Sequence, residues 1–212
     1  AHAAPYIHAA IGIHPESLIE EDAATVAVYH GDWRAELAAM RPLFEDKAVV
    51  AVGEIGLDHH WPVPRQEQYA LFEAQLQLAK ELDLPVSVHD REAHAEMYEL
   101  LRKYKPRGAL HCYSGSADDA AWLVEQGMYL GFGGAVTYKG AKRAAKVLAA
   151  IPHERALLET DCPYMAPEPV RGTRNDSRNI AHVAAYIGTI WDMDAQAVLD
   201  QTAQNARACF GV

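Results

Sequence analysis

Four residues with metal-binding side chains stand at the ends of four apolar, β-rich segments. Glu54 ends the second such segment of the chain, His89 the third, His111 the fourth and Asp161 the last. Two imidazoles and two carboxylates that converge form a mixed nitrogen and oxygen site for a divalent ion such as Zn²⁺, Mn²⁺ or Mg²⁺. Such an ion lowers the pKa of a bound water and polarises a phosphoryl or carbonyl oxygen. The pattern favours a metal hydrolase, with four unrelated structural polar residues as the alternative.

The elements that must position these residues alternate along the chain. Six short apolar segments are predicted as strands: 6–14, 48–56, 84–90, 108–114, 129–136 and 155–161. Most are apolar throughout, as buried parallel strands are. Helix-like stretches separate them, and the longest, 65–82, has apolar residues at a spacing of three and four. The alternation predicts an α/β fold with a parallel sheet.

A TIM-type (β/α) barrel fits these elements better than a dinucleotide-binding sheet. No G-x-G-x-x-G motif follows the first predicted strand. In a barrel the chemistry lies at the C-terminal ends of the strands, which is where the four polar residues stand. We expect residues 1–212 to form a single domain, in which the Pro- and Gly-rich segment 162–175 is a long functional loop.

The two-residue period of a strand sorts the neighbours of these four residues. Counting back by two gives a layer beneath the mouth of the barrel, in which Glu159 is the odd member and needs a Lys, Arg or His partner. Cys112 and Cys162 each follow a predicted ligand, so we expect both to be small buried hydrophobes on the opposite face. Asp90 is rejected on the same ground, whereas Arg91 returns to the face of His89 and could reach a phosphate.

The segment VGEIGLDHHW (52–61) contains three polar residues in a row after Glu54. Asp58 is expected to organise the loop or to support a ligand from behind. His59 and His60 are adjacent, so their side chains diverge on an extended chain. We expect them to be loop residues near the mouth and not metal ligands.

Several segments, taken in order, resemble the TatD family of metal-dependent deoxyribonucleases. They are GIHPE (12–16), VGEIGLD (52–58), PVSVHDREA (85–93), LHCYSGS (110–116), GGAVTYK (133–139), LLETDCPYMAP (157–167) and RGTRND (171–176). The resemblance runs from about residue 6 to the C-terminus. It implies a fold similar to the amidohydrolase-type barrels and a site with one or two divalent cations.

The resemblance implies roles for particular residues. Glu54, His89, His111 and Asp161 would be the metal ligands, the same set that the strand ends suggest. Glu54 would bridge the ions where two are bound, and Asp161 would also accept a proton from the attacking water. The residues that would lie near the substrate phosphate are His14, Arg91, Tyr113 and Arg174. The implied activity is hydrolysis of DNA phosphodiester bonds, often from the 3′ end, and members also act on RNA or small esters.

The chain departs from the family pattern at its N-terminal end. Family members begin with a strand that ends in an H-x-H pair of ligands, and this chain contains no H-x-H. One βα unit of a barrel of about 250 residues has about 30 residues, so two further units of about 60 residues in all would bring the chain to a normal family length. The chain therefore resembles a barrel without its first two units, through truncation, a mis-assigned start, or a natural short form completed by a partner subunit. We expect a homo-oligomer across that gap, because open sheet edges invite pairing.

Three functions remain open from the sequence. The first is a metal-dependent phosphodiesterase that cleaves DNA with a metal-activated water. The second is a hydrolase of esters, lactones or amides on the same scaffold, because specificity lies in loops. The third is a shortened, non-catalytic barrel that binds or assembles.

Composition excludes some classes of protein. The net charge is −10, which argues against a passive nucleic-acid coat but not against an enzyme whose cations meet the phosphates. Three cysteines do not form a disulfide framework, so a reducing cytoplasm is the expected location. No apolar run is long enough to predict a membrane span or a signal peptide.

Overall fold

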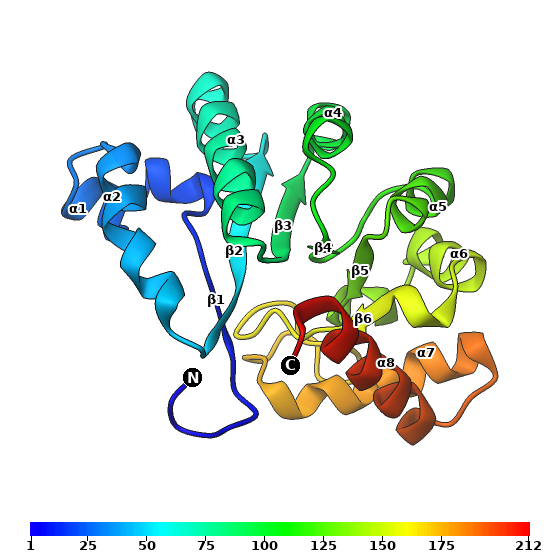
Figure 1. The fold of residues 1–212 in the computed structure, drawn as a ribbon. Helices are drawn as coiled ribbons and strands as arrows, with labels where there is room; N and C mark the ends of the chain where they lie inside the picture. The colour runs from blue at the N-terminus through cyan, green and yellow to red at the C-terminus, as the bar shows by residue number, and fades with distance from the viewer. The chain divides into compact units, whose positions relative to one another are not determined.

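Six strands alternate with helices in the computed structural model, which describes residues 1–212 (Figure 1). The strands are β1 (Ala9–Ile11), β2 (Val49–Asp58), β3 (Val86–Arg91), β4 (Gly108–Leu110), β5 (Tyr129–Phe132) and β6 (Ala156–Leu158). The helices are α1 (Ala24–Ala27), α2 (Trp33–Met40), α3 (Arg65–Leu82), α4 (His94–Tyr104), α5 (Ala117–Glu125), α6 (Lys142–Ala150), α7 (Ile180–Trp191) and α8 (Ala195–Phe210). Short 3₁₀ helices cover Pro15–Leu18, Arg41–Glu45, Gly134–Thr137, His153–Arg155 and Ser177–Asn179.

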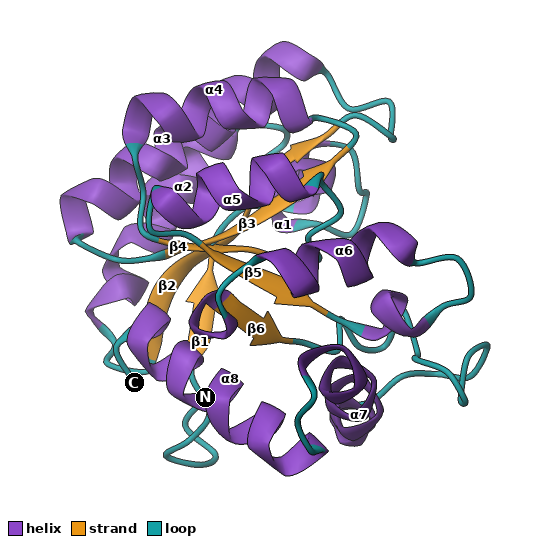
Figure 2. Ribbon diagram, turned by 90° about the vertical axis from the view of Figure 1, so that its right-hand side faces the viewer, coloured by secondary structure: helices purple, strands orange, loops and turns teal.

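The order of the strands confirms the predicted α/β class. The sheet runs β1-β2-β3-β4-β5-β6, in the order of the chain. The pairs β1/β2, β2/β3, β4/β5 and β5/β6 are parallel. Sequential parallel strands with helical crossovers, visible in Figure 2, are the winding of barrels, whereas a dinucleotide-binding sheet reverses its strand order.

The chain divides into two compact units, Ala1–Gly108 and Ala109–Val212. The first unit contains β1 to β3 with α1 to α4, and the second contains β5 and β6 with α5 to α8. None of the helices combines the length and the apolar character that crossing a bilayer requires.

Element boundaries agree with the sequence for the long elements and differ for the short ones. The amphipathic stretch 65–82 is α3 to the residue. By contrast, β4 ends at Leu110 and β6 at Leu158, so the predicted ligands His111 and Asp161 lie in turns beyond the strands. β2 continues to Asp58 and does not end near Glu54.

In the first unit, α3 lies alongside β2 (Figure 1). This helix buries Leu71, Phe72 and Leu76. Two buried amides on this helix bind backbone groups of the sheet side. Gln75 accepts a hydrogen bond from the N–H of Ile13 (2.7 Å) and donates to its carbonyl (3.0 Å). Gln68 does the same for Asp58, with both distances 2.7 Å. These contacts satisfy backbone groups that a strand end leaves without partners.

The second unit is held by polar anchors within an apolar core. Ala109, Leu157 and Cys209 pack together between the strands and α8. The amide of Asn205 on α8 donates to the carbonyls of His153 and Ala156, at 2.7 Å each. Because Ala156 begins β6, this side chain fixes the strand that leads to Glu159 and Asp161.

The replacement Gln75→Leu tests the amide anchor in the first unit. Leucine has a volume similar to that of glutamine but no polar atoms, so the N–H and C=O of Ile13 stay buried without these partners. Each unsatisfied group lowers the stability by about 1–3 kcal/mol. We expect the free energy of unfolding, measured by urea denaturation, to fall by about 2–4 kcal/mol.

Gln77→Leu is the matched control, because Gln77 is exposed on the same helix. We expect it to change the free energy of unfolding by less than about 0.5 kcal/mol. Equal losses in the two variants would show that the Ile13 contacts contribute nothing specific.

Candidate metal centre

The four predicted ligands fall into two groups, one in each compact unit. Glu54 and His89 belong to the first unit, on β2 and β3. His111 and Asp161 belong to the second, in the turns after β4 and β6. Within each group a histidine lies between two carboxylates.

In the first unit both ring nitrogens of His89 meet carboxylates. Nδ1 is 3.0 Å from Oε1 of Glu54, and Nε2 is 2.9 Å from Oδ2 of Asp58. Asp58 is fully buried and its other oxygen accepts the N–H groups of His60 and Trp61, at 2.9 and 3.2 Å. Asp58 is therefore fixed, whereas Glu54, which contacts the opposite nitrogen, is partly exposed. The expectation that Asp58 organises the loop is confirmed, and its role in supporting a metal ligand stays a prediction.

The pairing of β2 with β3 explains how Glu54 and Asp58 reach the same ring. Gly56 is paired with His89 in the parallel register, so Glu54 and Asp58 flank it two residues away on either side. A Cβ at Gly56 would collide with the backbone carbonyl of His89, and its φ of +154° also favours glycine. The register shifts between Val52 and Ile55, which is the irregular stretch that contains Glu54.

The carboxylates change the protonation of the first group. Burial alone would lower the pKa of His89, but its hydrogen bonds to Glu54 and Asp58 raise that pKa above the ordinary value. Burial alone would raise the pKa of Asp58, but hydrogen bonds from His89, Trp61 and His60 lower it. Asp58 therefore accepts the proton of Nε2 of His89, and a metal that binds Nδ1 would displace the proton that this nitrogen shares with Glu54.

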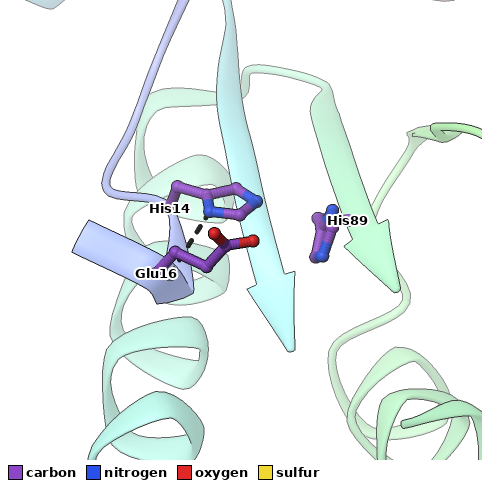
Figure 3. A group of neighbouring side chains, drawn as sticks. All are labelled: His14, Glu16 and His89. Carbon is purple, nitrogen blue, oxygen red and sulfur yellow. Dashed lines mark hydrogen bonds between the residues drawn. The ribbon is translucent and has the colours of Figure 1, made fainter. Parts of the chain in front are cut away.

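His14 and Glu16 complete the first group (Figure 3). Both come from the turn after β1 and face His89, and ligand atoms of the three residues lie within 4.8 Å of one another. The ring of His14 meets that of His89 edge to face at 4.4 Å, and its Nε2 is 3.7 Å from Glu54. Nδ1 of His14 accepts the N–H of Glu16 at 3.3 Å, so the neutral ring carries its proton on Nε2. His14 thus presents a hydrogen-bond donor to this group.

Glu16 was not predicted as a site residue. It stands in the first turn of the 3₁₀ helix Pro15–Leu18, with Pro15 at the start. Burial raises its pKa above the ordinary value, although the nearby His14 opposes this. A carboxylate two residues after a histidine, beyond a helix-starting proline, is the sequence signal that could have found it.

In the second unit His111 has the same arrangement. Nδ1 is 2.8 Å from Oε2 of Glu159, and Nε2 is 3.4 Å from Oδ1 of Asp161. Oε1 of Glu159 also accepts the N–H of Cys112 at 2.6 Å. The expected partner of Glu159 is thus found, and it is a histidine. Burial alone would lower the pKa of His111, but hydrogen bonds with Asp161, Cys112 and Glu159 raise it far above its ordinary value.

Turns after the short strands aim the side chains of the second group. Cys112 and Asp161 adopt left-handed backbone conformations, with φ of +47° and +53°. Such values are uncommon for residues other than glycine and concentrate at functional sites. On β5, a Cβ at Gly131 would collide with the carboxylate of Glu159, so glycine makes room for this side chain.

The expectations for the cysteines are wrong. Cys112 is half-buried, and its sulfur lies within 4.8 Å of ligand atoms of both His111 and Asp161. Cys162 is exposed. The two-residue alternation of a strand does not extend to these cysteines, because β4 ends at Leu110 and β6 ends at Leu158. The left-handed backbone at Cys112 instead places its side chain near that of His111. Burial raises the pKa of the Cys112 thiol to about 12.

Residues predicted to bind substrate have different surroundings. Arg91 is exposed at the end of β3, with its guanidinium 5.8 Å from the ring centroid of Trp61. Tyr113 is buried, and its hydroxyl donates to the carbonyl of Ser116 at 2.7 Å. Arg174 is exposed in the segment 162–175, which is a loop as expected. None of these contacts identifies a substrate, so the roles stay predictions.

Asn175 holds the loop 162–175 and was missed by sequence reasoning. Its amide donates to the carbonyls of Thr160 and Tyr164 at 2.7 Å each, and the residue is buried. It therefore ties the loop to both sides of Asp161. An asparagine in a polar loop carries no sequence signal for such a role.

Each group fits a divalent cation by its donor chemistry. A metal-ligating histidine usually donates its second nitrogen to a carboxylate or carbonyl, which fixes the tautomer. Asp58 does this for His89, and Glu159 does it for His111. The nitrogen that remains faces Glu54 in one group and Asp161 in the other.

Asp58→Asn tests the tautomer of His89. The amide donates where the carboxylate accepted, so the proton moves to Nδ1 and blocks the ligating nitrogen. We expect affinity for divalent cations to fall about 10–100-fold, as for other residues that orient ligands. Isothermal titration with Mn²⁺ and Zn²⁺ measures it.

Asp90→Asn is the matched control, because Asp90 lies beside His89 but binds His94 Nδ1 at 2.6 Å. Its metal affinity should equal that of the wild type. Unchanged affinity in Asp58→Asn would contradict the assigned role of Asp58.

Comparisons with known proteins agree with the resemblance drawn from the sequence. A family model described as TatD related DNase matches residues 1–211. The metal-dependent hydrolase YabD of Bacillus subtilis is 38% identical over 214 residues, covering 98% of this chain and 78% of YabD. The 3′-5′ ssDNA/RNA exonuclease TatD of Erwinia amylovora is 34% identical over 220 residues, with 99% and 80% covered.

The fold agrees as well. The crystal structure of YjjV, a TatD homologue from Escherichia coli, matches with a TM-score of 0.84 and 31% identity, covering 97% of this chain and 77% of YjjV. This confirms the predicted fold of the TIM-type, amidohydrolase-like barrels. The chain belongs to the TatD-related DNase family of metal-dependent hydrolases.

Proposed function

We propose that the chain hydrolyses phosphodiester bonds of single-stranded nucleic acid, DNA in the first place, from the 3′ end. The observation that carries this proposal is the repeated unit of a histidine between two carboxylates, of which one is less exposed than the other, Asp58–His89–Glu54 and Glu159–His111–Asp161. Relatives named as ssDNA/RNA exonucleases support the choice of substrate.

In this proposal the metal ligands are Glu54, His89, His111 and Asp161. Divalent cations bound there supply Lewis acidity and lower the pKa of a bound water. The chain's own residues orient the histidine ligands and accept protons. Asp58 accepts a hydrogen bond from Nε2 of His89 and Glu159 accepts one from Nδ1 of His111. Asp161 would accept a proton from the attacking water, and Glu54, which contacts Nδ1 of His89, would be a bridging ligand if two ions were bound.

Cationic and donor side chains near these groups would hold the phosphate. The chain has a net charge of −10, so an anionic polymer needs local positive charge. Arg91 follows His89 by two residues on β3, and Arg174 lies in the loop that Asn175 ties beside Asp161. The Nε2–H of His14 is suited to donate to an anionic oxygen. Tyr113 would contribute its ring, because its hydroxyl is engaged by Ser116.

The remaining expectations of the sequence are kept as part of this proposal. They are a cytoplasmic location, a single domain over residues 1–212, and a homo-oligomer. Size-exclusion chromatography with light scattering tests the last of these, and a stable monomer would contradict it.

Removal of metal or of a ligand tests the proposed activity. We expect release of nucleotides from 3′-labelled single-stranded DNA in Mg²⁺, Mn²⁺ or Zn²⁺ and none in EDTA. His89→Ala and Asp161→Asn should lower the rate by about 100-fold or more, because several kcal/mol of transition-state stabilisation come from the metal site. Asp90→Asn should keep the wild-type rate.

Small substrates separate this reaction from other hydrolases. A nitrophenyl phosphodiester should be hydrolysed faster than a nitrophenyl ester with each metal. The reverse order would favour an esterase or amidase on the same scaffold, and no turnover of any substrate would favour a non-catalytic module.

Arg91→Ala tests the binding of phosphate. Loss of one cation at a phosphate should raise KM for single-stranded DNA by about threefold to tenfold and reduce the salt dependence of binding, with kcat little changed.

Arg34→Ala is the matched control. Arg34 also stacks on a tryptophan, 4.0 Å from the ring centroid of Trp33, and its loss changes the net charge equally. The same rise in KM in both variants would show a general charge effect and not a contact at Arg91.

A further inference from the structure

Cys112 has no role in the proposed reaction, yet it stands among its metal ligands. Its sulfur, a ring nitrogen of His111 and a carboxylate oxygen of Asp161 lie within 4.8 Å of one another. All three residues belong to the second unit. The group therefore offers nitrogen, oxygen and sulfur to one ion.

The position of the thiol is held by the backbone. Glu159 binds the ring of His111 with one carboxylate oxygen and the N–H of Cys112 with the other. One side chain thus fixes a ligand and its neighbour together. Cys112 adopts a left-handed backbone conformation just after β4, and its sulfur lies within 4.8 Å of a ring nitrogen of His111.

The sulfur of Cys112 lies next to a second sulfur atom and beside a cavity. The thiol of Cys112 contacts the thioether of Met165 at 3.9 Å. Both residues line a cavity of about 460 Å³ beside β5. Ligand atoms of a tetrahedral zinc site lie roughly 3.5 Å apart, so small side-chain rotations within this group are sufficient to bind one ion.

We propose that Cys112, His111 and Asp161 are the three protein ligands of a zinc site in the second unit. The proposal rests on the proposed function in taking His111 and Asp161 as ligands. On binding, the S–H bond of Cys112 breaks, its proton passes to solvent, and a sulfur–zinc bond forms. Three protein ligands and one open position are the pattern of catalytic zinc sites.

The thiolate gives this site a metal preference. Thiolate and imidazole favour Zn²⁺ and Co²⁺, whereas Mg²⁺ takes oxygen ligands almost alone. We expect zinc to bind the second unit more tightly than magnesium. The group of His14, Glu16 and His89 contains no sulfur, so we expect no such preference there.

Cobalt reports directly on the sulfur. With Co²⁺ in place of zinc, the wild-type protein should show a near-ultraviolet thiolate-to-cobalt charge-transfer band. The band should persist in Cys162→Ser, which loses an exposed thiol next to Asp161, and disappear in Cys112→Ser. Cys112→Ser should also weaken zinc binding at least about tenfold and leave magnesium binding unchanged. A bound Co²⁺ without the band, or a band that survives in Cys112→Ser, would overturn the proposal.

Alkylation of the wild-type protein needs no variant. Zinc, but not magnesium, should protect Cys112 from iodoacetamide, with the modified peptide identified by mass spectrometry. Cys162 serves as the internal control, because it is exposed and should react under every condition. Equal alkylation of Cys112 with and without zinc, or no zinc bound at all, would overturn the proposal.

These readouts are independent of nuclease activity. A protein that shows the cobalt band but cleaves no DNA would keep the zinc site and lose the proposed function. A protein that cleaves DNA with magnesium while Cys112 stays unprotected would do the opposite.

Discussion

The hydrogen bond between a carboxylate and one ring nitrogen of a histidine is the interaction on which each of the two groups depends. A neutral imidazole can offer a metal only one nitrogen lone pair, and the N–H of its other nitrogen needs a hydrogen-bond acceptor. Asp58 is this acceptor for His89 and Glu159 is this acceptor for His111. Without these carboxylates either tautomer would be populated, and the nitrogen that faces Glu54 or Asp161 would be unavailable part of the time.

Much of the surrounding structure keeps these two carboxylates in place. Asp58 is held through its backbone by Gln68 of α3 and through its side chain by two N–H groups of the following turn. Glu159 is accommodated by the absent side chain of Gly131, and β6 before it is tied to α8 by Asn205. The polar residues buried on the helices are thus part of the site, because they determine where the strands end.

The sequence was informative where a regular period was long enough to read. The apolar spacing over 65–82 located α3 to the residue, since tertiary packing only had to accept an amphipathic helix. Glu54 and Asp58 are also related by the strand period, and Asp58 was expected to support a ligand. A Lys, Arg or His partner was predicted for Glu159 because a carboxylate beneath the mouth of a barrel is costly to remove from water without one. His111 is that partner.

The sequence failed where the backbone leaves its regular path. β4 and β6 have three residues each, so a two-residue period cannot be extended to Cys112 or Cys162. A left-handed turn at a residue other than glycine has no strong sequence signal, and it decides where the sulfur of Cys112 points. Glu16 lies near His89, which is far from it along the chain. Asn175 acts through hydrogen bonds within a folded loop. Neither kind of contact can be read from the local sequence.

Charge links metal binding to the binding of the proposed substrate. The first group places Glu54, Asp58 and Glu16 around two histidines, and the second places Glu159 and Asp161 around one. In a chain of net charge −10 these carboxylates attract cations and repel a phosphodiester. Cations bound there would reverse the sign of the local field, so metal affinity and affinity for the proposed anionic substrate would rise together, since by linkage each ligand strengthens the binding of the other. Groups rich in carboxylates are therefore compatible with the proposed anionic substrate, because the field that repels the phosphodiester is the same field that attracts the metal.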